Sequence, residues 1–414
     1  MVVRKSMQEE REYLPDVYPS VDQIERTHIN GEHYNTELYF LKWYKHYLES
    51  DIDNITFVTP QEAIQFDLDY FKEQLDKGKI VIDNSLEAET TTFHRTIAVL
   101  KDKEANLSNL FILVSGFQLR PNNDSVKFVK DFFGATIIHW PFWFVNEQHT
   151  MKKGGRPAND ELQDIKIDNK RNKKFVCLNN YFKPHRMGIL IELYKNNLLD
   201  EGYVSARWGF DPEDALHKNL ITLASFDDEM NRYGVNFVDE DLKSKFPMLL
   251  DDLESNKDQA LYENFQDRWM NKDWILDSMI NVVTESFYND DFINNCNILE
   301  HFGYDKTHQE IGFITEKTIK PIALCQPFMV IGNPGITKYL NSLGFTTFNN
   351  LFSRYDVSEN IHDRVNSVIY HLNTFEGDTY DNVTQQQLVH NREHFFKEDF
   401  VHKILMEVLD KING

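Results

Sequence analysis

A compact set of charged residues stands in the stretch GFITEKTIKPIALCQPFMVIGNPG (312–335). Thr315 is a good helix N-cap, so Glu316 and Lys317 fall in the first helical turn, where free backbone N–H groups and the helix dipole favour an anion. Lys317 and Lys320 are three residues apart and share one helix face. A diphosphate matches these donors, and Glu316 suits a sugar diol because a carboxylate only accepts hydrogen bonds. An amphipathic helix that begins in solvent accounts for the same residues.

A second polar set follows the apolar run KFVCLNN (174–180). Asn179 stands near the end of this run, and His185 and Arg186 come where the next helix begins. Arginine offers a planar fork of N–H donors to phosphate, and open α/β sheets bind phosphates at turns from strand to helix. We expect Arg186 and Lys317 to face solvent at their helix starts. A basic helix start in an acidic protein, with His185 as a packing or capping residue, is the competing interpretation.

Carboxylates follow a third apolar run, KIVIDNSLEAE (79–89). Glu87 and Glu89 come just after the predicted strand, and a carboxylate at the carboxyl end of a parallel strand is placed to act as a general base. The chain holds 66 acidic residues, so a solvated surface position is the simpler explanation for each of them. The sequence makes Glu87 and Glu89 the candidate catalytic carboxylates.

The elements that must position these residues alternate between strands and helices. Short apolar, β-branched runs separated by helical stretches predict parallel sheets that are covered on both faces. In the first half we expect strands at 78–85, 109–116 and 134–140 and helices at 36–50 and 60–78. In the second half we expect strands at 174–180, 220–225, 279–286, 327–332 and 345–348, and helices at 183–199, 315–325, 334–344 and within 356–414.

A domain boundary is predicted in the polar segment 151–174, which contains Gly and Pro and almost no large apolar residue. We therefore expect one α/β domain at 1–160, a second at 170–385 and a helical tail at 386–414. The predicted fold class is α/β, with two Rossmann-like domains whose parallel sheets face across a cleft. Such folds bind ligands between their halves.

The composition restricts the class of protein. A chain of 414 residues exceeds one ordinary core, and 41% hydrophobic residues suffice for well-packed globular domains. Three cysteines, Cys177, Cys296 and Cys325, show no C-x-x-C spacing, so we expect a reducing, cytoplasmic compartment rather than a disulfide scaffold. No run of about 18 apolar residues predicts a membrane span, which indicates a soluble protein. The net charge of −22 repels nucleic acid at long range.

Taken in chain order, these segments resemble the family 10 glycosyltransferases, the α-1,3-fucosyltransferases. The resemblance lies in VVTES (282–286), in FITEKTIKPIALCQPFMVIG (313–332), and in KFVCLNN with the HRMGILIEL that follows it. The family has there a strand with a Glu-Asn pair, a Tyr-x-Thr-Glu-Lys motif before a helix and an apolar strand, and an Arg-bearing helix. KIVIDNSLEAE resembles the family's strand that delivers a catalytic glutamate. The family's tyrosine is Phe313 here, and its Glu-Asn pair is Glu285-Ser286.

The resemblance implies a GT-B fold and an inverting, metal-independent transfer of a sugar from a nucleotide diphosphate, with GDP favoured over UDP. Domain 1–160 would take the acceptor, a glycan or another hydroxyl compound, and domain 170–385 the donor. Glu87, or Glu89, would be the catalytic base. Lys317 and Arg186 would hold the diphosphate, and Glu316 would accept from donor hydroxyls. The full set of predicted donor-site residues is Asn179, His185, Arg186, Glu285, Phe313, Thr315, Glu316, Lys317 and Lys320.

Three other functions compete with this prediction. A non-catalytic module of the same fold would bind a glycan or a nucleotide without turnover. A GT-A type transferase would use Mn²⁺ at Asp239 and Asp241. A transferase of the kind that viruses use would glycosylate a hydroxymethylated DNA base, although the net charge opposes DNA binding. The chain has no G-x-G-x-x-G, P-loop or H-E-x-x-H motif to support a dinucleotide, ATP or zinc-hydrolase function.

Overall fold

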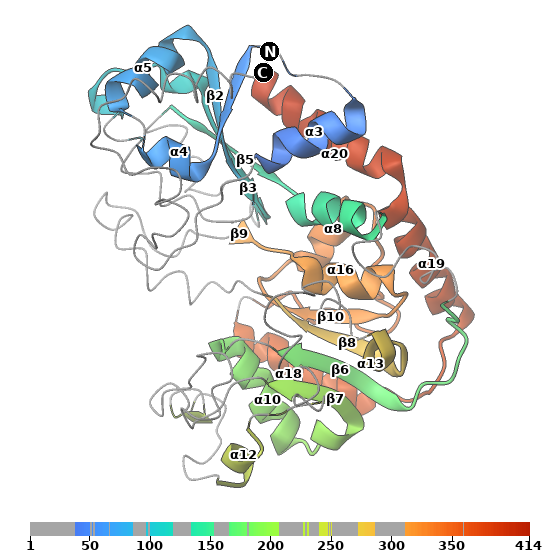
Figure 1. Ribbon diagram of the computed structural model, residues 1–414. Coiled ribbons are helices and arrows are strands. Elements are labelled where there is room, and N and C mark those ends of the chain that lie inside the picture. The colour runs from blue at the N-terminus through green and yellow to red at the C-terminus, as the bar shows by residue number, and fades with distance from the viewer. Residues whose placement is uncertain are drawn as a thin grey trace, which may run out of the picture. The chain divides into compact units, whose positions relative to one another are not determined.

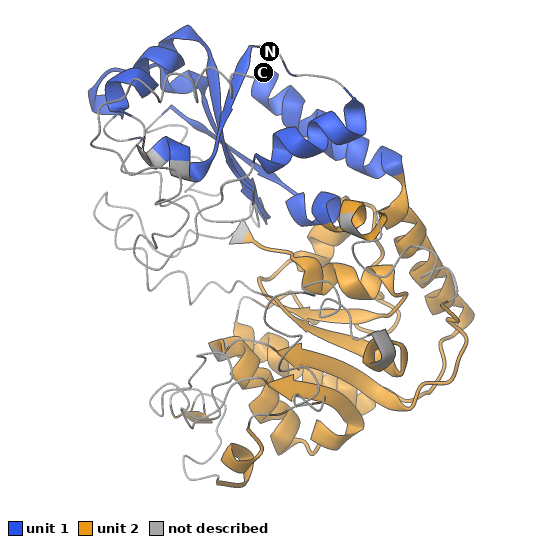
Figure 2. Cartoon of the chain, viewed as in Figure 1, with its two compact units in different colours: residues 1–146, 289–311, 398–414 blue, residues 147–288, 312–397 orange. Residues whose placement is uncertain are grey.

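The structure is a computed structural model of the chain. It describes residues 38–49, 52, 54–65, 67–85, 97, 100–118, 134–152, 165–179, 182–206, 227, 230–231, 240–246, 248, 250, 272–285, 311–358 and 360–414. The chain forms two compact units (Figure 2). Unit 1 draws on residues 1–146, 289–311 and 398–414, and unit 2 on residues 147–288 and 312–397. The chain therefore passes between the units more than once, and its C-terminal helix belongs to unit 1.

Unit 1 is built on a four-stranded parallel sheet with the order β1-β2-β3-β5. Neighbouring strands are in register, so that Ile82 lies beside Ile112 and Ile112 beside Ile137. All six residues of β3 are buried, as expected for a parallel strand covered on both faces. The four strands of this sheet are β1 (Ile55–Val58), β2 (Lys79–Asn84), β3 (Leu110–Ser115) and β5 (Thr136–Trp140), and the two-residue strand β4 (Phe117–Gln118) is not part of it. The helices are α3 (Tyr39–Leu48), α4 (Pro60–Gln65), α5 (Leu68–Lys77), the 3₁₀ turn Leu107–Asn109, the start of α8 (Phe142–Lys152) and α20 (Glu398–Asn413).

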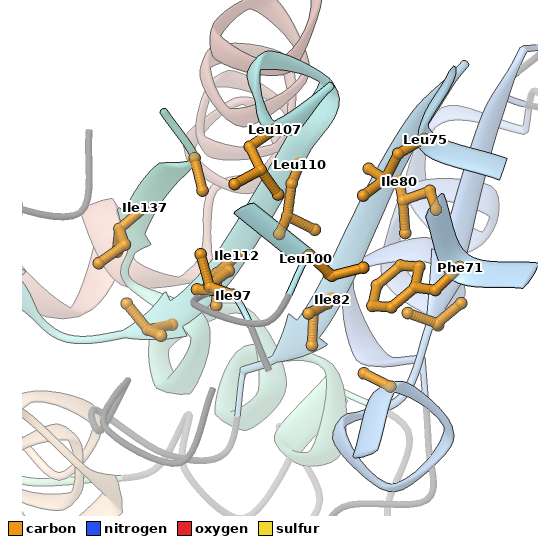
Figure 3. Packing of buried hydrophobic residues seen from close by; sticks show 14 residues of the cluster. Phe71, Leu75, Ile80, Ile82, Ile97, Leu100, Leu107, Leu110, Ile112 and Ile137 are labelled. Carbon is orange, nitrogen blue, oxygen red and sulfur yellow. The ribbon is translucent and has the colours of Figure 1, made fainter. Parts of the chain in front are cut away.

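The core of unit 1 lies between α5 and one face of the sheet (Figure 3). Phe71 and Leu75, one turn apart on α5, are buried with Ile80 and Ile82, which alternate along β2. Residues four apart share one face of a helix, and residues two apart share one face of a strand. All four side chains therefore point into the space between α5 and the sheet. The other face of the sheet packs against aromatic residues, among them Phe40 of α3 beside Trp140.

Unit 2 is built on a second four-stranded parallel sheet, with the order β10-β8-β6-β7 (Figure 1). Gly202 opens β7 because the ring of Phe175 lies against it, and a Cβ there would come within 2.5 Å of that ring. The strands are β6 (Lys173–Asn179), β7 (Gly202–Ala206), β8 (Ser278–Thr284) and β10 (Phe328–Ile331), and a two-residue strand β9 (Ile311–Gly312) precedes α16. The helices are α10 (Pro184–Lys195), the 3₁₀ turn Leu199–Glu201, α12 (Glu240–Ser244), α13 (Lys272–Leu276), α16 (Glu316–Ala323), α17 (Ile336–Ser342), α18 (Ile361–Thr374) and α19 (Asn382–Phe396).

The predicted fold class is confirmed: two all-parallel sheets with interspersed helices form two Rossmann-like α/β domains of GT-B-like type. The helix predicted at 60–78 is wrong in one respect, because Asp67 accepts hydrogen bonds from Asp69 N and Tyr70 N and so caps a separate second helix. The strand predicted at 345–348 is also wrong, since that segment is irregular. The strands β1 and β7 were not predicted. The predicted strand at 220–225 lies outside the described residues.

Candidate functional site

The carboxyl ends of β6 and β8 mark the switch point of the unit 2 sheet. The chain continues from β6 to β7 on one side and later returns to place β8 on the other side of β6. Right-handed crossovers in opposite directions put the connecting helices on opposite faces, α10 with α18 and α16 with α19 (Figure 1). Open α/β sheets bind their ligands at such a point, outside the carboxyl ends of the strands.

Asn179 joins the strand ends at this point. Its Oδ1 accepts a hydrogen bond of 2.6 Å from Thr284 Oγ1 at the end of β8. Its backbone N donates to Ser205 Oγ of β7 at 3.2 Å. Asn179 and Thr284 are both buried. Asn179 therefore ties the ends of β6, β7 and β8 together, which keeps the groups that follow these strands in fixed positions.

Glu285, the first residue after β8, holds a fully buried carboxylate against the start of α16. Its Oε1 accepts from Thr315 N at 3.1 Å and from Thr318 Oγ1. Its Oε2 accepts from Thr315 Oγ1 at 2.7 Å. The helix dipole favours a negative charge at this position. The anion at the N-terminus of α16 is thus a side chain of the protein itself.

Thr315 is the N-cap of α16, as the sequence predicts. Its Oγ1 accepts from Lys317 N at 3.3 Å, and Thr318 N donates to Thr315 O at 3.2 Å. Thr315 N donates to Glu285, and Lys317 N and Thr318 N donate to Thr315, so these backbone donors already have partners within the protein. An anionic ligand would therefore depend more on the charge of Lys317 than on the helix N-terminus.

Glu316 and Lys317 form an ion pair that remains partly accessible. Lys317 Nζ lies 2.9 Å from Glu316 Oε1, and the two side chains are 27% and 24% exposed. Burial raises the pKa of Glu316, but the charges of Lys317 and Lys320 and the hydrogen bond from Lys317 outweigh it and lower this pKa to about 2. Glu316 is therefore ionised at neutral pH and only accepts hydrogen bonds.

The start of α10 meets the backbone of Glu285. His185 Nε2 lies 2.9 Å from Glu285 O, and Arg186 Nη2 donates to the same oxygen at 3.5 Å. Burial first, then the charges of Arg186, Lys183 and Arg364, lower the pKa of His185 to about 3, although its hydrogen bond to Glu285 acts in the opposite direction. His185 is therefore neutral, and because a carbonyl oxygen only accepts, its proton is on Nε2.

The expectation that Arg186 faces solvent is wrong, because its side chain is only 3% exposed. Arg186 is in the first turn of α10, and that turn is buried at the end of β8. The side chain of Lys317, by contrast, is partly exposed to solvent. Phe313, another of the predicted donor-site residues, is buried as well. The structure brings most of the predicted donor-site residues to the end of β8 and the adjoining helix starts: Asn179, His185, Arg186, Glu285, Thr315, Glu316 and Lys317.

Arg364 belongs to the same region and was not predicted. It is 1% exposed in α18, and its Nη2 donates to Gly332 O, just beyond β10, at 2.8 Å. Ile361, Val365 and Val368, at neighbouring helical positions, are buried with it. A charged residue inside an apolar helical stripe is the signal that would have found it, since such a residue is rarely buried without a specific role.

The predicted catalytic residues Glu87 and Glu89 lie outside the described residues. The carboxylate that the structure describes on the preceding strand is Asp83, which is fully buried. Its Oδ2 accepts from Phe40 N at 2.7 Å, and its Oδ1 accepts from Ser85 Oγ. Burial raises the pKa of Asp83 to about 6, although these hydrogen bonds act in the opposite direction. Asp83 therefore caps the first turn of α3.

The described ranges contain neither a cluster of metal ligands nor a membrane-spanning helix. Among those residues, no three side chains of His, Cys, Asp or Glu converge as metal ligands. Asp239 is outside the described ranges, and Asp241 lies on α12 with Lys245 Nζ at 3.5 Å. No helix in these ranges is long and apolar enough to cross a membrane. Comparison with protein-family models, curated proteins and solved structures finds no match to the chain.

Proposed function

We propose that the protein is a glycosyltransferase that moves a sugar from a nucleotide diphosphate to an acceptor hydroxyl. The observation that carries the proposal is the meeting of two cationic helix starts at one strand end. Arg186 of α10 donates to the backbone of Glu285, and Glu285 also holds the first turn of α16, which carries Lys317. These groups lie at the switch point of a Rossmann-like sheet, where such folds bind nucleotides.

Local charge supports an anionic ligand at this strand end. The chain as a whole carries a net charge of −22. The pKa of His185 is nevertheless lowered by the positive charges of Arg186, Lys183 and Arg364, after the larger effect of burial. Three positive charges, those of Arg186, Lys183 and Arg364, therefore act at the end of β8 in a protein whose net charge is strongly negative. A diphosphate is the part of a sugar donor that these charges attract and that gains charge as the glycosidic bond breaks.

The Glu316–Lys317 pair supports a ligand that carries both a diol and a phosphate. Glu316 is ionised and accepts hydrogen bonds, and Lys317 is a donor with a positive charge. The two side chains are about one-quarter exposed, so a ligand can contact both without unfolding the helix start. In the proposed mechanism, Glu316 accepts from donor hydroxyls, Lys317 contacts the departing diphosphate, and buried Arg186 stabilises that diphosphate through space. A carboxylate of unit 1, Glu87 or Glu89, removes the proton of the acceptor hydroxyl in a direct inverting displacement.

The proposed donor is a GDP-sugar, with a UDP-sugar as the alternative, and the proposed acceptor is a glycan or another hydroxyl compound. The fucosyltransferase-like motif Thr315-Glu316-Lys317 supports this choice through the resemblance alone. The proposed reaction needs no metal, because Lys317 and Arg186 supply the positive charge that a metal supplies in other transferases.

A thermal-shift screen against GDP-, UDP-, CMP- and dTDP-sugars tests the proposal. A ligand at 100 times its Kd stabilises the protein by about 2.7 kcal/mol, so one nucleotide class will raise the melting temperature clearly. Transfer measured with that donor in excess chelator then separates the proposal from its rivals. Undiminished transfer removes a Mn²⁺-dependent GT-A mechanism. Binding without transfer to any acceptor identifies a non-catalytic module, and no shift with any donor refutes the proposal.

A further inference from the structure

Arg364 uses its guanidinium to hold two main-chain carbonyls. Nη2 donates to Gly332 O at 2.8 Å and Nη1 donates to Ser358 O at 2.6 Å. The side chain comes from α18 and is 1% exposed. These bonds tie the segment before α18 to the turn that follows β10. The turn is therefore fixed by a charged residue, although neutral amide side chains also donate to carbonyls.

The turn held by Arg364 packs directly on Glu285. A Cβ added to Gly332 would lie 3.2 Å from Glu285 Cβ and 2.9 Å from Ile336 Cδ1, so this glycine permits a close approach of the two strand ends. Glu285 is the residue that contacts both His185 and Thr315. Gly332 is therefore packed against the residue that organises the proposed donor site.

The charge of Arg364 also acts at this strand end. Burying a guanidinium costs hydration free energy, a cost that a neutral residue in the same place does not incur. Burial is the main cause of the lowered pKa of His185, whose ring lies 2.9 Å from Glu285 O, and the positive charge of Arg364 makes a smaller contribution in the same direction. The field of Arg364 therefore extends over the end of β8, where Arg186 also donates to Glu285 O.

We propose that Arg364 is a positioning residue of the donor site: its guanidinium fixes the Gly332 turn against Glu285, and its charge stabilises a bound nucleoside diphosphate through space. The inference rests on the proposed function, because it assumes that a diphosphate binds at the end of β8. It assigns no direct contact between Arg364 and the ligand. If the added phosphate is taken to lie about 8 Å from the guanidinium, with an effective dielectric constant of about 40, between the values for a protein surface and for water, one unit charge changes an affinity about sixfold.

Two pairs of ligands and a set of variants distinguish the effect of the Arg364 charge on binding from an effect of the substitution on folding. The Kd values of GDP and GMP, and of UDP and UMP, are measured by calorimetry on the full chain, because each pair differs by one phosphate. The variants are Arg364→Gln, which removes the charge, and Arg364→Lys, which keeps it. Arg171→Gln is the control, since Arg171 is also buried and holds carbonyls, including Ser278 O, at the opposite end of β8.

We expect Arg364→Gln to weaken the diphosphate about sixfold more than the monophosphate. Arg364→Lys should restore the wild-type ratio within about twofold, and Arg171→Gln should lower the melting temperature without changing the ratio. Three outcomes overturn this inference and leave the proposed function standing. The ratio of the monophosphate Kd to the diphosphate Kd is unchanged in Arg364→Gln, it changes equally in Arg171→Gln, or Arg364→Lys does not restore it. Binding of neither GDP nor UDP by the wild-type protein overturns the proposed function, and this inference with it.

A wild-type experiment covers the case in which Arg364→Gln does not fold. Hydrogen exchange of residues 332–337 is compared with saturating GDP and with saturating GMP, or with the uridine pair. Stronger protection by the diphosphate supports a coupling between the turn and the added phosphate. Equal protection by the two ligands contradicts it.

Discussion

Replacing Glu285 by glutamine tests whether this buried carboxylate organises the start of α16. Its two oxygens accept from Thr315 N, Thr315 Oγ1 and Thr318 Oγ1. Glutamine has one acceptor oxygen and one NH₂ group. If the NH₂ group faces Thr315 Oγ1, two donors meet, because that hydroxyl oxygen already accepts from Lys317 N and Lys317 Nζ. If the amide is reversed, the NH₂ group meets Thr315 N, which cannot accept a hydrogen bond. At least one buried donor is left without a partner in either orientation.

An unmet buried donor costs about 1–3 kcal/mol, and bonds to a charged acceptor contribute about 1.5–3 kcal/mol. Neutralising the buried charge offsets part of this loss. We expect a net loss of about 2–3 kcal/mol in the local stability of the first turn of α16. At about 1.36 kcal/mol per factor of ten, this makes the Thr315 amide exchange about 30- to 150-fold faster.

Hydrogen exchange read by mass spectrometry with single-residue fragmentation measures this amide directly. Glu192→Gln is the matched control, because Glu192 is also a buried carboxylate of unit 2 but bonds to Lys195 on its own helix. It should leave the Thr315 rate unchanged. A Thr315 rate in Glu285→Gln within about threefold of the control would refute the assigned role of Glu285.

Other predictions concern the remaining groups. Lys317→Ala should lower kcat by roughly 10²-fold, the scale for losing one charge-stabilising donor. Arg186 is buried and acts through space, so Arg186→Ala should lower kcat less than Lys317→Ala does and should also destabilise the protein by about 1–3 kcal/mol. Glu87→Gln should abolish transfer and leave calorimetric donor binding intact, because a base acts on the acceptor; normal turnover would move the base to Glu89 or elsewhere. For Asp83, a pKa raised from 3.8 to about 6 means that folding stability falls by about 3 kcal/mol as pH rises from about 4 to above 6. The Asp83→Asn variant of the full chain should lack this fall in stability when its melting is followed across the same pH range. An equal pH dependence in the wild-type and variant proteins would contradict the raised pKa of Asp83.

The sequence predicted the elements that are continuous apolar runs. KIVIDN, LFILVS and FMVI are buried on both faces of parallel sheets, so their strands need no alternation and stand out as hydrophobic segments. The strand β1 has only four residues, and β7 includes Tyr203 and Ser205 among its five, so neither forms an apolar run. Long-range pairing with β2 and β6 makes these two segments strands, and local sequence does not record that pairing.

The candidate site was predictable where it depends on local sequence. The N-cap Thr315 and the pair Glu316–Lys317 are neighbours in the chain, and their arrangement follows from the helix they begin. Glu285 stands 30 residues before Thr315, and its capping of α16 depends on how β8 packs beside β10. Arg364 reaches the same place from α18. Tertiary packing of this kind, which also buries Arg186, cannot be read from the spacing of charged residues.

The affinity of a nucleoside diphosphate for wild-type and Lys317→Ala protein tests the central claim most directly. Lys338→Ala is the control, since Lys338 is an exposed lysine on α17 of the same unit. Titration calorimetry with GDP and UDP should give saturable binding of one of them to the wild-type and Lys338→Ala proteins. Lys317→Ala should weaken that binding at least about tenfold, because a charge-assisted bond to phosphate contributes about 1.5–3 kcal/mol. Equal affinity in all three proteins, or no binding of either nucleotide, would contradict the assignment of the donor site to the end of β8.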